Sequence, residues 1–216
     1  MRVLTFLVIL PAATLALGGG ALAYLTSIAP RTSPEMEPRV HHLITDEMAA
    51  DAEAARRQLA PRIETVDAYG KSLVLGGPGP QFVYFIKEGC PCSYDAEPFF
   101  KALEASYGKK VRFAAVTDGD LAAAKRWSTE LSQPFPIASD PELRAMRAFG
   151  AKASVYSCLI DRKGRIVRLW PGFSKTLLTD INKTIAREAG EALRPLDLTF
   201  APVEKATGCT FGVTAG

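Results

Sequence analysis

The sequence has little of what marks several common classes of protein. Among its 216 residues, 26 basic and 23 acidic side chains give a net charge of only +3, and the two signs are interspersed. Proteins that bind nucleic acid carry a basic excess or a basic patch, so we expect no nucleic-acid partner. Four cysteines are too few for a small fold held together by disulfides. The roughly 185 residues beyond the N-terminal segment suffice for one domain with its own core.

Histidine is scarce as well. The only two, His41 and His42, are adjacent and lie far along the chain from any cysteine. Adjacent histidines on a linker supply no converging set of ligands, so we expect no metal site and no cofactor. Delivery of Cu(I) by the thiolates of Cys90 and Cys92 stays open as an alternative, because soft thiolates suit that ion.

Charged residues are absent from Val3 to Pro30, and Arg2 precedes this run. Ala21-Leu22-Ala23 fits the small-x-small pattern of a signal-peptidase site. We therefore predict that residues 1–30 are a signal peptide or a transmembrane anchor, and the length of the run favours the anchor. The bulk of the chain is then extracytoplasmic, in the periplasm or at the cell surface, and attached to the membrane through this segment. Cleavage after Ala23 would give a secreted protein.

Residues 31–61 differ in composition from the residues after them. The stretch opens with prolines and continues through an alanine-rich, charged segment, 45–59, which predicts a helix. Its apolar stripe is narrow, so we expect a juxtamembrane linker, partly helical, that holds the domain off the membrane. A dimerising helix is the alternative.

Apolar patterning from residue 62 to residue 192 predicts a domain in which strands and helices alternate. The expected strands lie at 82–86 and 111–116, the hairpins at 63–75 and 155–170, and the helices at 93–107, 120–131, 141–149 and 177–189. This order predicts an α/β fold with a mixed central sheet and helices on both faces, preceded by an N-terminal hydrophobic helix.

The segment Cys90-Pro91-Cys92-Ser93 follows the strand expected at 82–86, at the point where a helix is expected to begin. Helix N-terminal amides favour a thiolate, and the thiolate is the attacking species in disulfide exchange and in peroxide reduction. We therefore identify Cys90 as the candidate nucleophile and expect its sulfur to be reachable from solvent. The alternative is that both cysteines are buried fillers.

This order of elements, with a cysteine after the first long strand, resembles the thioredoxin fold. Within that fold it resembles the redoxin and alkyl hydroperoxide reductase/thiol-specific antioxidant group. Pro98, eight residues after Cys90, matches the proline that kinks the active-site helix of such proteins. The segment 159–166 resembles the family's apolar strand, glycine turn and returning strand. The resemblance covers about 63–190 and implies a redox-active centre at Cys90, in an exported type of redoxin with a Cys-Pro-x-Ser motif.

The chain also departs from the family pattern. Ser93 stands where a thioredoxin has its second cysteine, and Val155 falls where the family has a cis-proline beside the active thiol. Residues 86–89 lack the proline and threonine that approach the cysteine of a typical peroxiredoxin. We expect Pro91, Ser93, Val155 and Tyr156 to line the substrate groove.

The tail, 193–216, carries Gly208-Cys209-Thr210-Phe211. Some exported redoxins have a similar glycine-cysteine step near the C-terminus, and this resemblance implies that Cys209 folds back as a resolving or bridging partner of Cys90 or Cys92. A structural disulfide that pins a loose tail is the alternative. A Cys90–Cys92 bridge would be strained and easily reduced, and Cys158 is expected to be a packed core residue.

Charges near the motif suggest a weakly activated nucleophile, because Glu88, Asp95 and Glu97 would oppose ionisation while Lys87 would favour it. These observations together indicate an extracytoplasmic thiol-disulfide oxidoreductase whose partners are protein disulfides or thiols. A thiol peroxidase acting on hydroperoxides and a non-catalytic binding module of the same fold are the alternatives.

Overall fold

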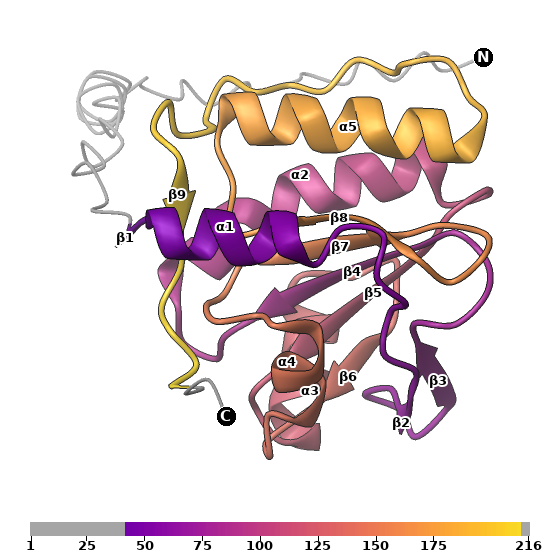
Figure 1. Ribbon diagram of the computed structural model, residues 1–216. Helices are drawn as coiled ribbons and strands as arrows, with labels where there is room; N and C mark the ends of the chain where they lie inside the picture. Colours follow the sequence, from indigo (N-terminus) through magenta and orange to yellow (C-terminus); the bar gives the residue numbers. More distant parts are fainter. Residues whose placement is uncertain (1–41, 213–216) are drawn as a thin grey trace, which may run out of the picture. The chain divides into compact units, whose positions relative to one another are not determined.

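The computed structural model describes residues 42–212. The predicted signal peptide or anchor, 1–30, and His41 lie outside these residues. Within the described part of the chain, no helix combines the length and the apolar character that crossing a bilayer requires. The predicted α/β architecture is confirmed, with a mixed central sheet that has helices on both faces (Figure 1).

The central sheet has the strand order β6-β5-β4-β7-β8. Its strands are β4 (Gln81–Ile86), β5 (Arg112–Thr117), β6 (Ile137–Ser139), β7 (Ser157–Ile160) and β8 (Ile166–Trp170). β4 runs parallel to β5 and antiparallel to β7, and all six of its residues are buried. A strand covered on both faces needs apolar residues on both, which explains the unbroken apolar run in the sequence. β6 was not predicted, because three residues are too few for a pattern.

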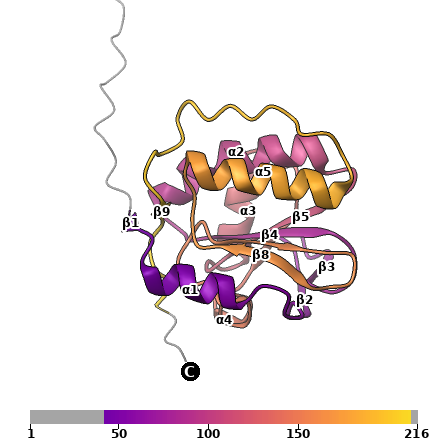
Figure 2. The same ribbon diagram turned by 45° about the horizontal axis from the view of Figure 1, so that its top comes forward.

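Five helices cover the sheet in the described residues: α1 (Asp46–Ala54), α2 (Pro91–Tyr107), α3 (Leu121–Glu130), α4 (Arg144–Phe149) and α5 (Lys175–Ala189). Figure 2 shows α2 and α5 side by side on one face and α1 and α4 on the other. Two clusters of buried residues correspond to these faces. We call them the α2-side cluster, which contains Phe82 and Tyr84, and the α1-side cluster, which contains Val83 and Phe85. Successive side chains of β4 point to opposite faces of the sheet, so alternate residues of this strand belong to different clusters.

Several helix boundaries differ from the predictions: α1 ends at Ala54 rather than near residue 59, and α5 begins at Lys175, two residues earlier than expected. α2 begins at Pro91, two residues earlier than expected, because proline suits the first turn of a helix. α4 begins at Arg144 rather than near residue 141. Leu143 has a left-handed φ of +56°, and the Asp140 carboxylate accepts hydrogen bonds from the first amides of the helix.

The segment predicted as a linker belongs to the fold from His42 onward, so the spacer prediction was wrong for this part of 31–61. α1 packs against β8 through the narrow stripe of Met48, Ala52 and Ala55, which joins the α1-side cluster. Lys152 fastens the helix, with its Nζ 2.6 Å from a Glu47 carboxylate oxygen. These three residues are four and three positions apart, so they lie on one face of the helix.

The fold contains two predicted hairpins, one outside the central sheet and one within it. The pair β2 (Ile63–Val66) and β3 (Ser72–Leu75) is antiparallel, as predicted, and the carboxylate of Asp67 accepts hydrogen bonds from two amides of its turn. β7 and β8 form the second hairpin, whose turn contains Gly164 with a φ of +76°.

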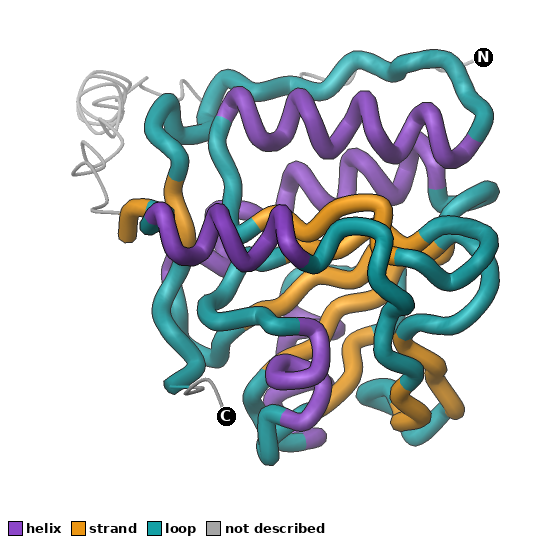
Figure 3. The backbone as a smooth tube through the Cα atoms, viewed as in Figure 1, coloured by secondary structure: helices purple, strands orange, loops and turns teal. Residues whose placement is uncertain are grey.

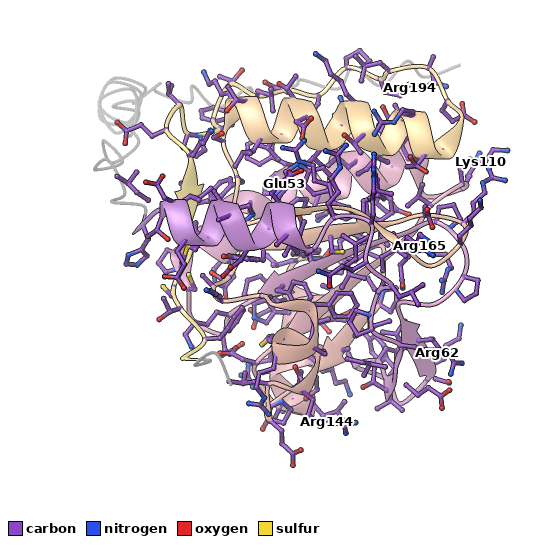
Figure 4. The ribbon with its side chains drawn as sticks, in the orientation of Figure 1. Glu53, Arg62, Lys110, Arg144, Arg165 and Arg194 are labelled. Atoms are coloured by element: carbon purple, nitrogen blue, oxygen red, sulfur yellow. The ribbon has the colours of Figure 1, made fainter. Side chains whose placement is uncertain are left out.

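The C-terminal tail returns over the domain (Figure 3). β9 (Ala206–Thr207) pairs with β1 (His42–Leu43), and Leu196 and Leu198 pack against the α2-side cluster. Neither of these short strands was predicted. The basic side chains labelled in Figure 4 extend from separate elements rather than gathering on one, in keeping with the interspersed charge of the sequence.

Candidate active site

Cys90 lies at the junction of β4 and α2, where it is the N-cap residue of the helix. Gly89 precedes it with a φ of +71°, which favours glycine and turns the chain from the strand into the helix. Asp118, just beyond the parallel strand β5, fixes this loop. Its carboxylate accepts hydrogen bonds from Lys87 Nζ at 3.0 Å and from Glu88 N at 2.7 Å.

The sulfur of Cys90 has polar neighbours from two distant segments. Ser154 Oγ lies 3.2 Å away, and the backbone N–H of Cys209 donates a hydrogen bond to the sulfur over 3.3 Å. Cys90 is only 1% exposed. The expectation that this thiol is reachable from solvent was therefore wrong, because the tail lies over it. The cover consists of an amide, a hydroxyl and thiols as well as hydrocarbon, so it leaves the sulfur in a polar setting.

The tail reaches Cys90 by pairing with the segment just before β7. Ser154 N donates to Cys209 O at 3.0 Å, Gly208 N donates to Ser154 O at 3.1 Å, and Phe211 N donates to Lys152 O at 3.0 Å. A Cβ atom on residue 208 would lie 1.8 Å from Ser154 Oγ, so any residue other than glycine would require the Ser154 hydroxyl to move from its place beside Cys90. Cys209 is thereby brought beside Cys90 from 119 positions away in the sequence.

Val155, at the position aligned with the family's proline, has an unusual backbone conformation. Its φ of +66° is left-handed, which is rare for a β-branched residue, and no peptide bond among residues 42–212 is cis. Two hydrogen bonds with β4 hold it there: Val155 N donates to Phe85 O, and Phe85 N donates to Tyr156 O. Val155 is 1% exposed and belongs to the same buried cluster as Cys90, so it lines no open groove.

Tyr156 lies on the other face of the sheet. It belongs to the α1-side cluster and is 1% exposed, and its hydroxyl has no hydrogen-bond partner among the described residues. The turn at Ser154 and Val155 ends before Tyr156, which belongs to the cluster on the face of the sheet opposite Cys90. The prediction that Tyr156 lines a substrate groove was wrong for this reason.

Pro91 and Ser93 occupy different positions on the first turn of α2. Pro91 is exposed beside the thiol. Ser93 is fully buried, and its Oγ accepts a hydrogen bond from Lys87 N at 3.1 Å. Ser93 therefore shapes the loop before the thiol and lines no groove in this structure.

The two other cysteines differ in their surroundings. Cys92 is buried at 5% exposure in the α2-side cluster, and its thiol interacts with the sulfur of Cys90. Cys158 is completely buried in the α1-side cluster, on the opposite face, and burial raises its pKa. Its position agrees with the prediction of a packed core residue.

The pKa of Cys90 is lowered from its ordinary value. The largest cause is hydrogen bonding with the Cys92 thiol; burial opposes the shift, and the Cys209 thiol and the Ser154 hydroxyl add to it. The same interaction raises the pKa of Cys92 and of Cys209. An N–H group can only donate, so the amide of Cys209 also favours the ionised sulfur. These interactions favour a thiolate at Cys90 and protonated thiols at Cys92 and Cys209.

Weak activation was expected from Glu88, Asp95 and Glu97, and the structure shows why Glu88 and Glu97 have little effect. Glu88 is engaged by Arg126 Nη2 at 2.7 Å and by Trp127 Nε1 at 2.8 Å. Glu97 is buried and accepts a hydrogen bond from the Tyr84 hydroxyl. Arg126 compensates the charge of Glu88, and burial raises the pKa of Glu97, so the groups in contact with the sulfur determine its pKa.

Alkylation of Cys90 should depend little on pH near neutrality. A lowered pKa keeps the thiolate populated below pH 7, so the rate with iodoacetamide at pH 6 should stay within about twofold of the rate at pH 8. An ordinary thiol slows nearly a hundredfold, roughly, over that interval. The measurement is mass spectrometry of the peptide that contains Cys90, with urea-unfolded protein as the control. A tenfold change per pH unit in folded protein would contradict the lowered pKa.

Ser154 is the site residue that the sequence analysis missed. No motif marks it, and its position one residue before Val155 was the sole available signal. Among residues 42–212, no group of three or more His, Cys, Asp or Glu side chains is arranged to hold a metal ion.

Comparison with known proteins supports the fold described above. The family model described as Redoxin matches residues 56–185. A search of curated proteins found no match. Among solved structures, a putative thiol:disulfide interchange protein DsbE from Chlorobium tepidum is 22% identical, with a TM-score of 0.57, over 62% of this chain and 98% of that one.

Two further structures are similar. A putative protein disulfide isomerase from Bacteroides thetaiotaomicron is 19% identical, with a TM-score of 0.56, over 63% of this chain and 91% of that one. Peroxidoxin BcpB from Mycobacterium tuberculosis is 15% identical, with a TM-score of 0.54, over 62% of this chain and 96% of that one. At these identities the likeness concerns the fold, which is thioredoxin-like as predicted.

Proposed function

The chain belongs to the Redoxin family, and from this premise we propose that it is an extracytoplasmic thiol-disulfide oxidoreductase that acts through Cys90. The observation that carries the proposal is the contact between Cys90 and Cys209. A sulfur with a lowered pKa at a helix N-terminus is hydrogen-bonded to the backbone of a second cysteine. Disulfide exchange needs such an attacking thiolate and a second thiol within reach.

The exchange balances with the residues present. The Cys90 thiolate attacks one sulfur of a partner disulfide; the partner's S–S bond breaks, and its leaving thiolate takes up a proton. Cys209, once deprotonated, then attacks the Cys90 sulfur and releases the second partner thiol. The partner disulfide is reduced to a dithiol, and the two protein thiols are oxidised to a Cys90–Cys209 disulfide. Run backwards, the same steps oxidise a partner dithiol.

Cys209 suits the resolving step better than Cys92 does. A bridge between Cys90 and Cys92 would have to close across Pro91 inside the first turn of α2, against the preferred geometry of a disulfide. Cys209 is on a tail whose backbone already touches the Cys90 sulfur, and it is only partly buried. A short tail movement is a smaller change than distortion of a helix.

Replacing Cys209 with serine should trap the mixed disulfide. Without the resolving thiol, the Cys209→Ser protein should react once with glutathione disulfide and keep glutathione on Cys90, and turnover should fall about a hundredfold or more. Intact-mass analysis under non-reducing conditions measures the adduct. The matched control is Cys92→Ser, which should still release the partner; a trapped adduct in that variant instead would make Cys92 the resolving residue.

Thiol-dependent peroxide reduction is the second candidate function, and the lowered pKa of Cys90 favours it. The thiolate would attack a hydroperoxide oxygen, break the O–O bond and release an alcohol, leaving a sulfenic acid. Cys209 would condense with that acid and release water, which gives the same Cys90–Cys209 disulfide.

Single-turnover kinetics separate the candidates. Reduced protein is mixed with glutathione disulfide or with cumene hydroperoxide, and the Cys90–Cys209 disulfide is followed by non-reducing peptide mapping. Faster reaction with the disulfide supports the exchange function. Rapid consumption of hydroperoxide with slow exchange would replace it with the peroxidase. Reaction with neither would point to the non-catalytic binding module.

We also propose that residues 1–30 export and anchor the chain. The support is the uncharged run from Val3 to Pro30 preceded by Arg2. We expect the full chain to sediment with membranes, to resist extraction at high salt and to be digested by protease added outside the cytoplasmic membrane. Protection from that protease, or recovery in the soluble cytoplasmic fraction, would contradict export.

A further inference from the structure

The C-terminal segment 208–211 contacts the Cys90 sulfur and pairs with residues 152–154 as an added strand. We infer that this segment is an internal stand-in for the partner. The partner is then an extended polypeptide with its cysteine in a Gly-Cys-x-aromatic sequence, which must displace the segment to react. This inference rests on the proposed exchange function and deepens it by naming the class of partner.

Backbone pairing is the first observation. Residues 208–211 and 152–154 exchange hydrogen bonds in both directions across Ser154, and Ala153 and Thr210 face each other as an antiparallel bridge. Such bonds are made by any extended peptide, so they supply affinity for a strand without dependence on its side chains. A partner strand that takes this place regains every backbone bond that the tail gives up.

The side chains of the segment supply the sequence preference. The first position favours glycine, because a Cβ atom would lie 1.8 Å from Ser154 Oγ and would displace this hydroxyl from Cys90. At the second, the N–H of Cys209 donates to the Cys90 sulfur, which brings the two cysteines together. Thr210, at the third, is exposed and is left free to vary.

Phe211 fills the fourth position. It is 6% exposed within the α1-side cluster, and the ammonium group of Lys87 lies 5.8 Å from its ring centroid. An aromatic ring thus gains both burial and a cation–π contact at this place. A small side chain at this position would remove the cation–π contact with Lys87 and would leave a cavity in the α1-side cluster.

Anchors upstream of the segment allow it to leave without unfolding the domain. Phe173 and Ala206 exchange backbone hydrogen bonds at 2.7 and 3.0 Å, and Lys175 N donates to Pro202 O at 2.8 Å. These contacts hold the tail up to β9. Release of 208–211 is therefore a local opening, and Cys209 stays tethered near Cys90 while the partner occupies the edge.

The test uses the full chain with Cys92→Ser and Cys209→Ser, in which Cys90 is the remaining thiol outside the sheet core. Three peptides are supplied as 2-thiopyridyl disulfides: Thr-Gly-Cys-Thr-Phe, Thr-Ala-Cys-Thr-Phe and Thr-Gly-Cys-Thr-Ala. Cys90 attacks the peptide sulfur, the bond to the pyridyl sulfur breaks, and the released 2-thiopyridone keeps the electron pair, takes up a proton and is followed by absorbance. The first peptide should react about tenfold faster than either of the others.

Competition with the wild-type chain provides a second measurement that needs no variant. The three activated peptides are mixed in equal amounts with reduced wild-type protein, and their consumption should show the same preference. Equal rates in both experiments would overturn the inference while leaving the exchange function in place if glutathione disulfide is still reduced. Failure of Cys90 to react with any of these disulfides would overturn both.

Discussion

Replacement of Cys90 with serine is expected to abolish thiol-disulfide exchange, with a fall of about a thousandfold or more in rate. The serine hydroxyl does not ionise near neutral pH and is a poor nucleophile towards sulfur. The interaction with Cys90 is the largest cause of the raised pKa of Cys92 and of Cys209, and it is lost in this variant. Burial, which also raises both pKa values, remains, and neither cysteine has the N-cap position, so the remaining thiols should not take over. Serine is close to cysteine in size, so the fold should persist.

Cys158→Ala is the matched control for this loss. Cys158 is completely buried on the opposite face of the sheet, so its removal should leave the exchange rate within about twofold of wild type while lowering stability by about 1 kcal/mol. The measurement is reduction of glutathione disulfide by each protein after full reduction. Retention of exchange by Cys90→Ser, or its loss in Cys158→Ala, would remove Cys90 from the role of nucleophile.

Truncation of Phe82 to alanine should lower the free energy of unfolding by about 3–5 kcal/mol. Phe82, in β4, is completely buried, and its ring centroid lies 5.2 Å from that of Phe113, 5.5 Å from that of Phe100 and 6.5 Å from that of Trp170. Alanine would remove these contacts and leave a cavity that the surrounding rings cannot close. The loss is a large share of the roughly 5–15 kcal/mol that stabilises an ordinary domain.

Phe200→Ala is the control, since Phe200 is 86% exposed and its truncation should change stability by less than about 0.5 kcal/mol. Urea titration followed by tryptophan fluorescence measures both variants, and the comparison requires an unchanged dependence of the free energy on urea. A similar small effect at both positions would mean that the packing of β4 against α2 contributes little to the fold.

Local patterns were sufficient for most of the architecture. The apolar run from Phe82 to Ile86 marks a strand covered on both faces, and Pro98 and Gly164 lie in the helix and turn predicted for them. Local patterns did not predict elements that are very short or whose burial depends on another segment. β6 is only three residues long. The narrow apolar stripe of α1 is buried because it packs against the sheet, which the sequence of the helix does not show.

The surroundings of the thiol show the same division. A cysteine at the start of a helix can be recognised from the residues on either side of it, and so can a glycine-cysteine step in the tail. The burial of Cys90, the hydroxyl of Ser154 beside it and the seating of Phe211 could not be predicted. They result from contacts between segments 64 and 119 positions apart.

The sequence by itself determined that this chain forms an α/β domain of the redoxin type with a cysteine where β4 meets α2, because strand and helix periodicity and helix-start residues are local properties. Only the tertiary structure decided the state of that cysteine. Its ionisation depends on donors within hydrogen-bond distance, and its accessibility depends on the tail that lies over it. Both result from folding that brings distant segments together, which no local pattern encodes.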